Sequence, residues 1–542
     1  MSFLRLAFLC AVVADGALVP DTMTVETGDV LGVRDTAAGV RTWLGVPFAD
    51  TTAGVNAWAA PARRPAWSPA VFNATAFGPG CFSPHHNPDV AKNMSFDCLN
   101  ANIFAPVLAA GETVPVMVFL YGGAYLEGDN QGPFGIYGGA VFASTQKVAV
   151  VALGYRLGAF GWLAALDGSG IDGNFGLMDQ IAGLQWVQRN AAAFGGDASK
   201  VTVFGESAGA MSIGILMTLP AAKGLFRSAI MESNVGGFNY PNKTHAQVYA
   251  SSFCSDARLN CSVGGKCDAA CLRAADAQAV MDAWNTATGN VVDFILTDLG
   301  HILDGLLGTG PVVDGAFVAA EPQEAVEGGA YWAAGMPVLL GTNTNEGETF
   351  IYDGVPALPN FLAPLAYTGI FGFDEKIAAD IDAQPRYNYS QYTDARESLS
   401  HVVTDYWFRC ADEKFLVSPA AAGAGAYAYR YNHVYSNASI FPTFGLPEIC
   451  ASVVCHASEL PFVFHNVPYF TSFQPDEAAF SLQMVTFWAN FAKTGNPNPD
   501  PANPVWPAWD LSGRKTLVLN TSGLVVERSD QCDFWDRFGY FF

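Results

Sequence analysis

The amino-acid sequence predicts an α/β fold, with a central, mostly parallel sheet flanked by helices and a small antiparallel sheet near the N-terminus. Short continuous apolar runs alternate along the chain with longer segments in which apolar residues recur at helical spacing. Strands buried on both faces read as continuous apolar runs, and alternation of strands and helices is typical of parallel sheets. Hydrophobic residues make up 51% of the 542 residues, which is enough for a large core and excludes a largely disordered chain.

The expected strands of the parallel sheet are seven runs, at residues 114–121, 148–153, 201–204, 229–231, 338–340, 426–431 and 516–519. Helices are expected between them, and the clearest covers residues 176–193, where Leu177, Ile181 and Leu184 share one face. Residues 23–48 instead predict a small antiparallel meander. No repeat or low-complexity linker divides the chain, so residues 17–542 are expected to form one domain.

Residues 1–16 have the pattern of a secretory signal peptide. A single basic residue, Arg5, precedes an apolar run over residues 6–14, and small residues follow at Gly16 and Ala17. The run is too short to span a bilayer, and no later stretch reaches the roughly 18 apolar residues that a membrane helix needs. The sequence therefore predicts a secreted, extracellular protein with no integral membrane segment. The alternative interpretation of residues 1–16 is a buried N-terminal strand.

The charge of the chain limits its partners. Fifty acidic residues against 27 basic ones give a formal charge of −23. Such an excess repels the phosphates of nucleic acids and the head groups of anionic lipids. We therefore expect no nucleic-acid partner, and the composition indicates no particular oligomeric state.

The cysteines are typical of an exported protein. Of the 11, Cys10 lies in the expected signal peptide, so an even number remains for disulfide bonds. The sequence has no C-x-x-C spacing with a matching histidine, which is the pattern that would predict a metal site. Seven N-x-Ser/Thr sequons agree with export and with a glycoprotein, at Asn73, Asn93, Asn242, Asn260, Asn388, Asn437 and Asn520.

A nucleophile elbow is predicted at Gly205-Glu-Ser-Ala-Gly209, which follows the expected strand 201–204 and precedes a helical run at 210–218. The elbow is a tight strand-to-helix turn that exposes a serine hydroxyl, here that of Ser207. A serine needs a base to take its proton, and the α/β-hydrolase chain order is serine, acid, histidine. Glu346 and His456 follow in that order, in loops after expected strands. Glu348 competes as the acid, but the glycine after Glu346 favours Glu346.

These motifs resemble the type-B carboxylesterase/lipase family of cholinesterase-like α/β-hydrolases. The resemblance covers nearly the whole expected mature chain. Its matches are the block 174–234, Gly45-Val-Pro-Phe48, Asp97-Cys-Leu99, Tyr121-Gly-Gly123, residues 155–160, Glu346-Gly347 and Cys532-Asp-Phe-Trp535. The resemblance implies carboxylic ester hydrolysis with Ser207 as nucleophile, Glu346 as acid and His456 as base, and it implies no cofactor or metal.

The resemblance also implies an oxyanion hole made of the backbone N–H groups of Gly123, Ala124 and Ala208. The family has a third glycine where this chain has Ala124, and alanine keeps the N–H group but resists backbone angles that glycine accepts. The family also has glycine where this chain has Ala457, directly after the expected base.

The family template implies disulfide bonds Cys81–Cys98 and Cys410–Cys532. Four more cysteines, Cys254, Cys261, Cys267 and Cys271, then form two bonds in one surface loop, with three possible connectivities. Cys450 and Cys455 are left as an additional pair immediately before His456. We hypothesise that this bond stiffens the loop that presents the base.

Other family positions imply supporting contacts. Arg156 and Asp405 match a family ion pair and are expected to pair structurally. A second family ion pair is replaced here by Ala57 and Phe96, so that both charges are absent together. Ser233 matches a family serine near the acid, with an ordinary polar residue at a strand end as the alternative. Glu206 is interpreted as a buried, hydrogen-bonded partner in the elbow, and His465, downstream of His456, as structural.

Small to medium soluble esters are the expected substrates. In cholinesterases a tryptophan of the first disulfide loop binds the quaternary ammonium group, and residues 82–97 contain none, so choline esters are not expected. Tyr125, Phe238 and Tyr240 are candidates for the pocket wall, with packing in the core as the alternative. Two alternatives remain open: a lipase acting on longer-chain acylglycerols, and a non-catalytic adhesion or binding member of the superfamily.

Overall fold

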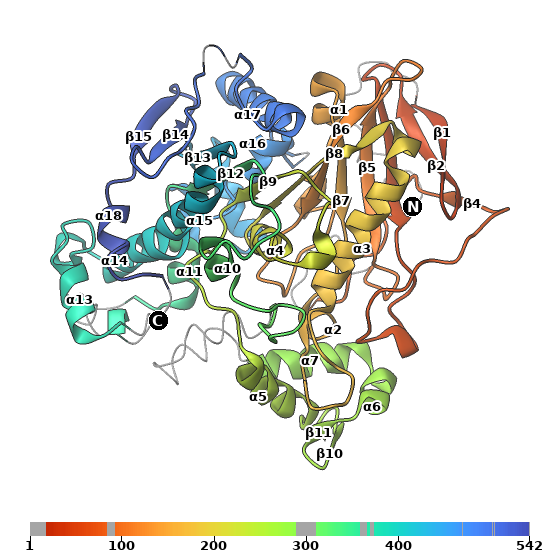
Figure 1. The fold of residues 1–542 in the computed structure, drawn as a ribbon, viewed down its shortest axis with the longest axis horizontal. Coiled ribbons are helices and arrows are strands. Elements are labelled where there is room, and N and C mark those ends of the chain that lie inside the picture. Colours follow the sequence, from red (N-terminus) through yellow and green to blue (C-terminus); the bar gives the residue numbers. More distant parts are fainter. Residues whose placement is uncertain are drawn as a thin grey trace.

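A computed structural model of the chain describes residues 18–83, 93–288, 310–357, 366–368, 373–468, 470–500, 502 and 504–540. The expected signal peptide, with Cys10, lies outside these residues. Within them, one 13-stranded sheet has the order β1-β2-β3-β5-β7-β6-β8-β9-β12-β13-β14-β15, with β4 beside β2 (Figure 1). The expected α/β fold is confirmed.

The strands of this sheet are β1 (Leu18–Val25), β2 (Gly28–Asp35), β3 (Val40–Pro47), β4 (Val71–Asn73), β5 (Asn100–Pro106), β6 (Val114–Leu120), β7 (Ala149–Leu153), β8 (Gly196–Glu206), β9 (Ser228–Glu232), β12 (Val338–Asn343), β13 (Ala426–Tyr431), β14 (Lys515–Leu519) and β15 (Val525–Arg528). All seven predicted runs are strands, and the run from β7 through β14 is parallel throughout. The predicted meander is β1–β3, and its last strand joins the large sheet through antiparallel pairing with β5.

The helices are α1 (Ala140–Gln146), α2 (Gly158–Trp162), α3 (Phe175–Asn190), α4 (Ala208–Leu216), α5 (Lys243–Cys254), α6 (Ala269–Ala274), α7 (Ala277–Thr288), α10 (Pro322–Glu327), α11 (Glu346–Gly354), α13 (Glu375–Asp382), α14 (Ala395–Val402), α15 (Cys410–Ala421), α16 (Leu460–Phe464), α17 (Pro475–Thr494) and α18 (Cys532–Trp535), with a π-helix at Val403–Arg409. α3, α4 and α15 pack on the sheet and α10 packs on α4 and α15, while α1 and α17 pack on each other and on strands β3, β5, β6, β7 and β8.

α5, α6 and α7 form a separate lobe with the short hairpin β10 (Ser262–Val263) and β11 (Lys266–Cys267), seen below the sheet in Figure 1. This lobe shares a second hydrophobic core with α2. Its four cysteines pair as Cys254–Cys267 and Cys261–Cys271, which selects one of the three connectivities left open by the sequence. The structure also contains the bonds Cys81–Cys98, Cys410–Cys532 and Cys450–Cys455.

The expected ion pair between Arg156 and Asp405 is wrong. Arg156 follows β7 and faces α3, where its guanidinium group binds both carboxylate oxygens of the buried Asp179 at 2.7 Å. Asp405 lies instead in the π-helix, where Arg386 and Arg409 neutralise it. Arg386 and Arg409 are therefore the arginines close to Asp405 in the fold, whereas Arg156 is paired with Asp179 of α3.

The paired loss of charge at Ala57 and Phe96 leaves an apolar cluster. Phe96 packs against Phe82 and Phe160, with ring centroids 4.7 and 5.4 Å apart. Ala57 is buried in the same core as Phe160. Both positions, where the resemblance implies that a family ion pair is absent, therefore take part in apolar packing, which agrees with the cost of leaving half an ion pair buried.

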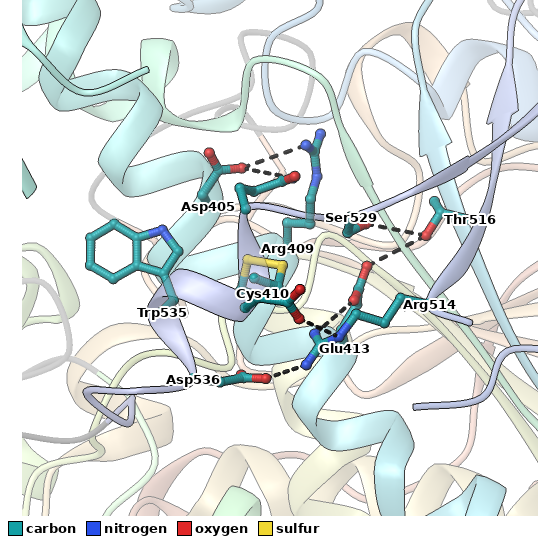
Figure 2. Close-up of a disulfide and its surroundings, with 12 residues drawn as sticks. Asp405, Arg409, Cys410, Glu413, Arg514, Thr516, Ser529, Trp535 and Asp536 are labelled. Atoms are coloured by element: carbon teal, nitrogen blue, oxygen red, sulfur yellow. Dashed lines mark hydrogen bonds and ion pairs between the residues drawn. A yellow bond between two sulfur atoms is a disulfide. The ribbon is translucent and has the colours of Figure 1, made fainter. Parts of the chain in front are cut away.

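Figure 2 shows how the C-terminal segment is attached to the body of the protein. The bond Cys410–Cys532 joins the first residue of α15 to the first residue of α18. Beside it, the buried Arg514 binds Glu413 at 3.2 Å and also pairs with Asp536. The end of the chain is therefore fixed to the helix that directly follows the π-helix.

Candidate active site

Ser207 lies in a strained turn between β8 and α4. Its backbone angles are φ 54° and ψ −124°, which L-residues rarely adopt. A Cβ atom at Gly209 would overlap the carbonyl oxygen of Leu120, and one at Gly205 would lie 2.6 Å from the same oxygen. Both glycines of the motif are therefore required because the end of β6 passes directly beside the turn. The N–H group of Ser207 donates to the carbonyl of Glu232 at 2.9 Å, which fixes the turn to β9.

His456 and Glu346 meet although they are far apart in sequence. His456 Nδ1 is 2.6 Å from Glu346 Oε2. Glu346 is fully buried, and its other oxygen accepts hydrogen bonds of 2.6 Å from the Ser233 hydroxyl and from the Asn343 N–H group. Because the carboxylate can only accept, Nδ1 carries the proton and Nε2 is the basic nitrogen.

The two competing residues lie elsewhere. Glu348 accepts a hydrogen bond from the Asn345 side chain at 2.8 Å rather than contacting the histidine. His465 bonds to the Ser481 hydroxyl at 2.9 Å. The structure therefore brings Glu346, and neither of these residues, against His456.

Glu206 faces the other nitrogen of the imidazole. Its Oε1 is 3.1 Å from His456 Nε2, and both side chains are buried. Burial raises the pKa of Glu206 to about 7, although the nearby imidazole acts to lower it. Burial would lower the pKa of His456, but the carboxylates of Glu206 and Glu346 outweigh burial and raise it to about 9. The charge of Glu206 therefore bears directly on the basicity of His456.

Two further buried carboxyl groups, those of Glu232 and Glu459, interact with Glu206 and were not predicted from the sequence. Glu232 accepts a hydrogen bond from the Trp488 indole at 2.7 Å, and Glu459 accepts one from the Asn343 side chain at 2.5 Å. Burial raises the pKa of Glu459 to about 8 and that of Glu232 well above its ordinary value. Burial therefore favours the neutral form of both carboxyl groups, which limits the negative charge that they place around His456.

The turn that carries Gly123 and Ala124 passes next to Ser207. A Cβ atom at Gly122 would lie 2.9 Å from the Ser207 Cβ, so only glycine fits there. Gly123 has φ 107° and Ala124 has φ 52°. Ala124 therefore adopts a left-handed backbone angle that glycine would accept more easily, at a cost of about 1–2 kcal/mol. Ala208 is the first residue of α4, where backbone N–H groups have no acceptor within the helix. Ala457 is likewise left-handed, at φ 65°.

An aromatic wall borders the histidine. Phe350 and Phe408 lie with ring centroids 5.1 and 5.3 Å from the His456 ring. Trp407 contacts Phe350 and continues to Phe238, whose centroid is 4.6 Å away. Phe350 is partly exposed and offers apolar surface beside the candidate base, whereas the other three rings are buried behind it.

Two of the three predicted pocket residues line one cavity, and the third is buried next to Tyr240. Phe238 and Tyr240 line a cavity beside α4, together with Met211, which is four residues beyond Ser207. Tyr125 instead packs edge-to-face on Trp162 in the core and is fully buried. The cavity thus retains two of the three candidates.

The π-helix supports both the acid and the base. The Thr404 hydroxyl accepts a hydrogen bond of 2.9 Å from the N–H group of Gly347, the residue after Glu346. Phe408, one turn later, contacts the His456 ring. A π-helix within an α-helical segment is frequently found at functional sites.

No described group of three or more histidine, cysteine, aspartate or glutamate side chains is placed to hold a metal ion. Among the same described residues, none of the helices is both long and apolar enough to cross a membrane.

Comparison with known proteins agrees with this geometry. The model of the carboxylesterase family matches residues 20–535, so the chain belongs to that family and is a carboxylic ester hydrolase with the α/β-hydrolase fold. It is 33% identical to a para-nitrobenzyl esterase of Bacillus subtilis (strain 168), covering 94% of this chain and 97% of that protein. It is 31% identical to an acetylcholinesterase of Bungarus fasciatus, covering 98% of this chain and 88% of that protein. A solved PNB esterase structure superposes with a TM-score of 0.77 at 30% identity, covering 95% of this chain and 99% of that chain.

Proposed function

We propose that the protein is a secreted serine esterase that cleaves small to medium carboxylic esters with a Ser207–His456–Glu346 triad. The observation that carries the proposal is the 2.6 Å contact between His456 Nδ1 and Glu346 Oε2. Glu346 is itself fixed by Ser233 and Asn343, so the tautomer that leaves Nε2 basic is enforced. The strained elbow at Ser207 supports its role as the nucleophile.

The reaction proceeds through an acyl-enzyme. Ser207 Oγ attacks the ester carbonyl while His456 Nε2 takes the hydroxyl proton, and the alcohol leaves with that proton. Water then attacks the acyl-enzyme, again with His456 as the base. Glu346 holds the imidazole and stabilises its protonated form in each step.

The tetrahedral oxyanion is bound by the N–H groups of Gly123, Ala124 and Ala208. Support comes from the turn of Gly122 and Gly123 beside Ser207, and from the place of Ala208 at the start of α4. Such preorganised donors are worth about 10²–10³-fold in kcat when one is removed.

The walls of the site support the proposed substrate class. Phe350 offers an apolar contact for an acyl or alcohol group, and Phe238 and Tyr240 line the cavity beside α4. The absence of tryptophan from residues 82–97 argues against choline esters, although the acetylcholinesterase named above is a relative. Most of residues 82–97 lie outside the described part of the chain.

Export is supported by the disulfide bonds. All ten cysteines of residues 17–542 are paired in five bonds, and such bonds persist in oxidising compartments. We propose that residues 1–16 are removed as a signal peptide and that residues 17–542 form one catalytic domain. N-terminal sequencing of the secreted protein tests this boundary.

Labelling with a fluorophosphonate probe tests the proposed nucleophile. The wild type should be labelled and the Ser207→Ala variant should not, and an unlabelled wild type would favour the non-catalytic binding alternative. An ester chain-length series then tests substrate size. A preference for long, emulsified esters over short soluble ones would favour the lipase alternative.

A further inference from the structure

The loop that presents His456 is closed by a disulfide bond directly in front of it. Cys450 and Cys455 are both buried, and their Cα atoms are 5.4 Å apart. The bond encloses only residues 451–454, because the sequence separation is 5, against 122 for Cys410–Cys532. A bond that closes so short a loop removes little chain entropy from the unfolded state. Its main physical effect is therefore local, on the residues next to it.

Asn345, the residue before Glu346, binds this loop through two hydrogen bonds. Its N–H group donates to the Val454 carbonyl at 2.9 Å, and the Val454 N–H group donates to Asn345 Oδ1 at 3.4 Å. The side-chain Nδ2 of Asn345 in turn donates to Glu348 Oε1 on α11 at 2.8 Å. Both backbone polar groups of Val454 are consequently bound by the residue adjacent to the acid.

α11 makes a second contact with the loop, at the other end of the disulfide. The Thr349 hydroxyl is 3.9 Å from Cys450 Sγ, and it must be the donor because a disulfide sulfur carries no hydrogen. The loop is thus held against the acid-bearing helix both near Cys450 and near Cys455.

We propose that Asn345, Cys450, Val454 and Cys455 form an acid–base clamp, a positioning device that sets the separation of Glu346 and His456. The inference rests on the proposed function, in which these two residues are the acid and the base. The disulfide holds the loop in one conformation. Asn345 binds that loop and directly precedes Glu346, so it fixes the position of the acid relative to the loop. Preorganisation of this kind matters because a displacement of about 1 Å can cost about 10²-fold in rate.

The clamp predicts a kinetic effect that a purely structural bond would not produce. In a Cys450→Ala/Cys455→Ala variant, kcat for p-nitrophenyl acetate should fall about 10–100-fold with KM little changed, since the loss lies in the alignment of the base. The acid limb of the pH profile, where kcat/KM falls as His456 becomes protonated, should also move to lower pH. Three carboxyl groups face His456, those of Glu206, Glu346 and Glu459, and a larger distance from Glu346 removes part of the negative charge that favours the imidazolium form.

A matched control is available in the α5–α7 lobe. The bond Cys261–Cys271 also closes a short loop, with a sequence separation of 10, but lies in the second hydrophobic core. A Cys261→Ala/Cys271→Ala variant should lower Tm and leave kcat and the acid limb at their wild-type values. Equal effects of the two double variants on kcat would overturn the clamp.

Asn345→Ala provides the test if the clamp double variant does not fold. It removes only the side-chain half of the contact with Val454, so kcat should fall by several fold, with the same direction of pH shift. Wild-type kcat and pH profile in Asn345→Ala would overturn the inference. Failure of the proposed function is a different result, because the wild type itself would then resist fluorophosphonate labelling.

Discussion

Replacement of Glu206 by glutamine should move the pH dependence of ester hydrolysis to lower pH. Glutamine keeps the size of the side chain but removes the carboxylate that lies 3.1 Å from His456 Nε2. His456 acts as a base only when it is neutral, so kcat/KM falls as the pH drops through its pKa. The carboxylate of Glu206 raises that pKa, and its removal therefore extends activity toward acid.

The size of the shift can be worked from the separation. Two unit charges 3.1 Å apart interact by about 5 kcal/mol at an effective dielectric of 20, which corresponds to about 4 pH units. The pKa of Glu206 is itself about 7, so the carboxyl is partly protonated over the relevant range and contributes less than a full charge. We therefore expect the acid limb to move down by about 1–2 units, within the range seen for close opposite charges.

The assay is kcat/KM for p-nitrophenyl acetate measured from about pH 5 to about pH 10, a range that brackets these pKa values. Glu321→Gln is the matched control, because Glu321 is also a largely buried carboxyl with a pKa of about 8 but is not among the groups with the largest effects on His456. An acid limb that stays in place in Glu206→Gln, or that moves upward, would refute the electrostatic coupling. An equal shift in the control would refute its specificity.

Three further changes test the site and its support. Ser233→Ala removes the hydroxyl that binds Glu346 at 2.6 Å, so kcat should fall about 10–100-fold with an unchanged KM in steady-state kinetics. Gly209→Ala places a Cβ atom on the Leu120 carbonyl oxygen and should lower the free energy of unfolding by about 1–3 kcal/mol in urea titration; an unchanged midpoint would contradict the packing argument. Trp488→Phe leaves the buried carboxyl of Glu232 without its indole donor and should cost about 1–3 kcal/mol in the same titration, whereas a neutral result would mean that the carboxyl finds another donor.

The apolar strands were predictable because each is a continuous run, but β5 was not. It begins with Asn100 and Asn102, which read as loop residues, yet both are buried. Asn102 accepts a hydrogen bond from the Gly45 N–H group and donates to the Asn130 carbonyl, while Asn130 donates to the Asn100 carbonyl. Polar side chains that satisfy one another across loops carry no local signature of a buried strand.

In the candidate site, the acid and the base were predictable from the sequence, whereas the buried carboxyl groups around them were not. Chain order and flanking motifs selected Glu346 and His456, and the structure brings them together. Glu232 and Glu459 could not be found in this way, because an isolated glutamate is solvated by default and only the fold shows that it is buried. The wrong pairing of Arg156 with Asp405 has the same origin, since a charge partner is decided by which helix packs nearby.

The number of residues in the π-helix decides whether its side chains can contact both the acid and the base. Successive residues of a regular helix are separated by about 100° of rotation, so the loss of one residue from Val403–Arg409 would turn Thr404 and Phe408 relative to each other. One of them holds the residue after Glu346 and the other packs on His456, so they could no longer serve both partners at once. Insertions and deletions should therefore be far less tolerated here than substitutions, and Cys410, bonded to the C-terminal segment immediately after the π-helix, prevents the chain from absorbing such a change downstream.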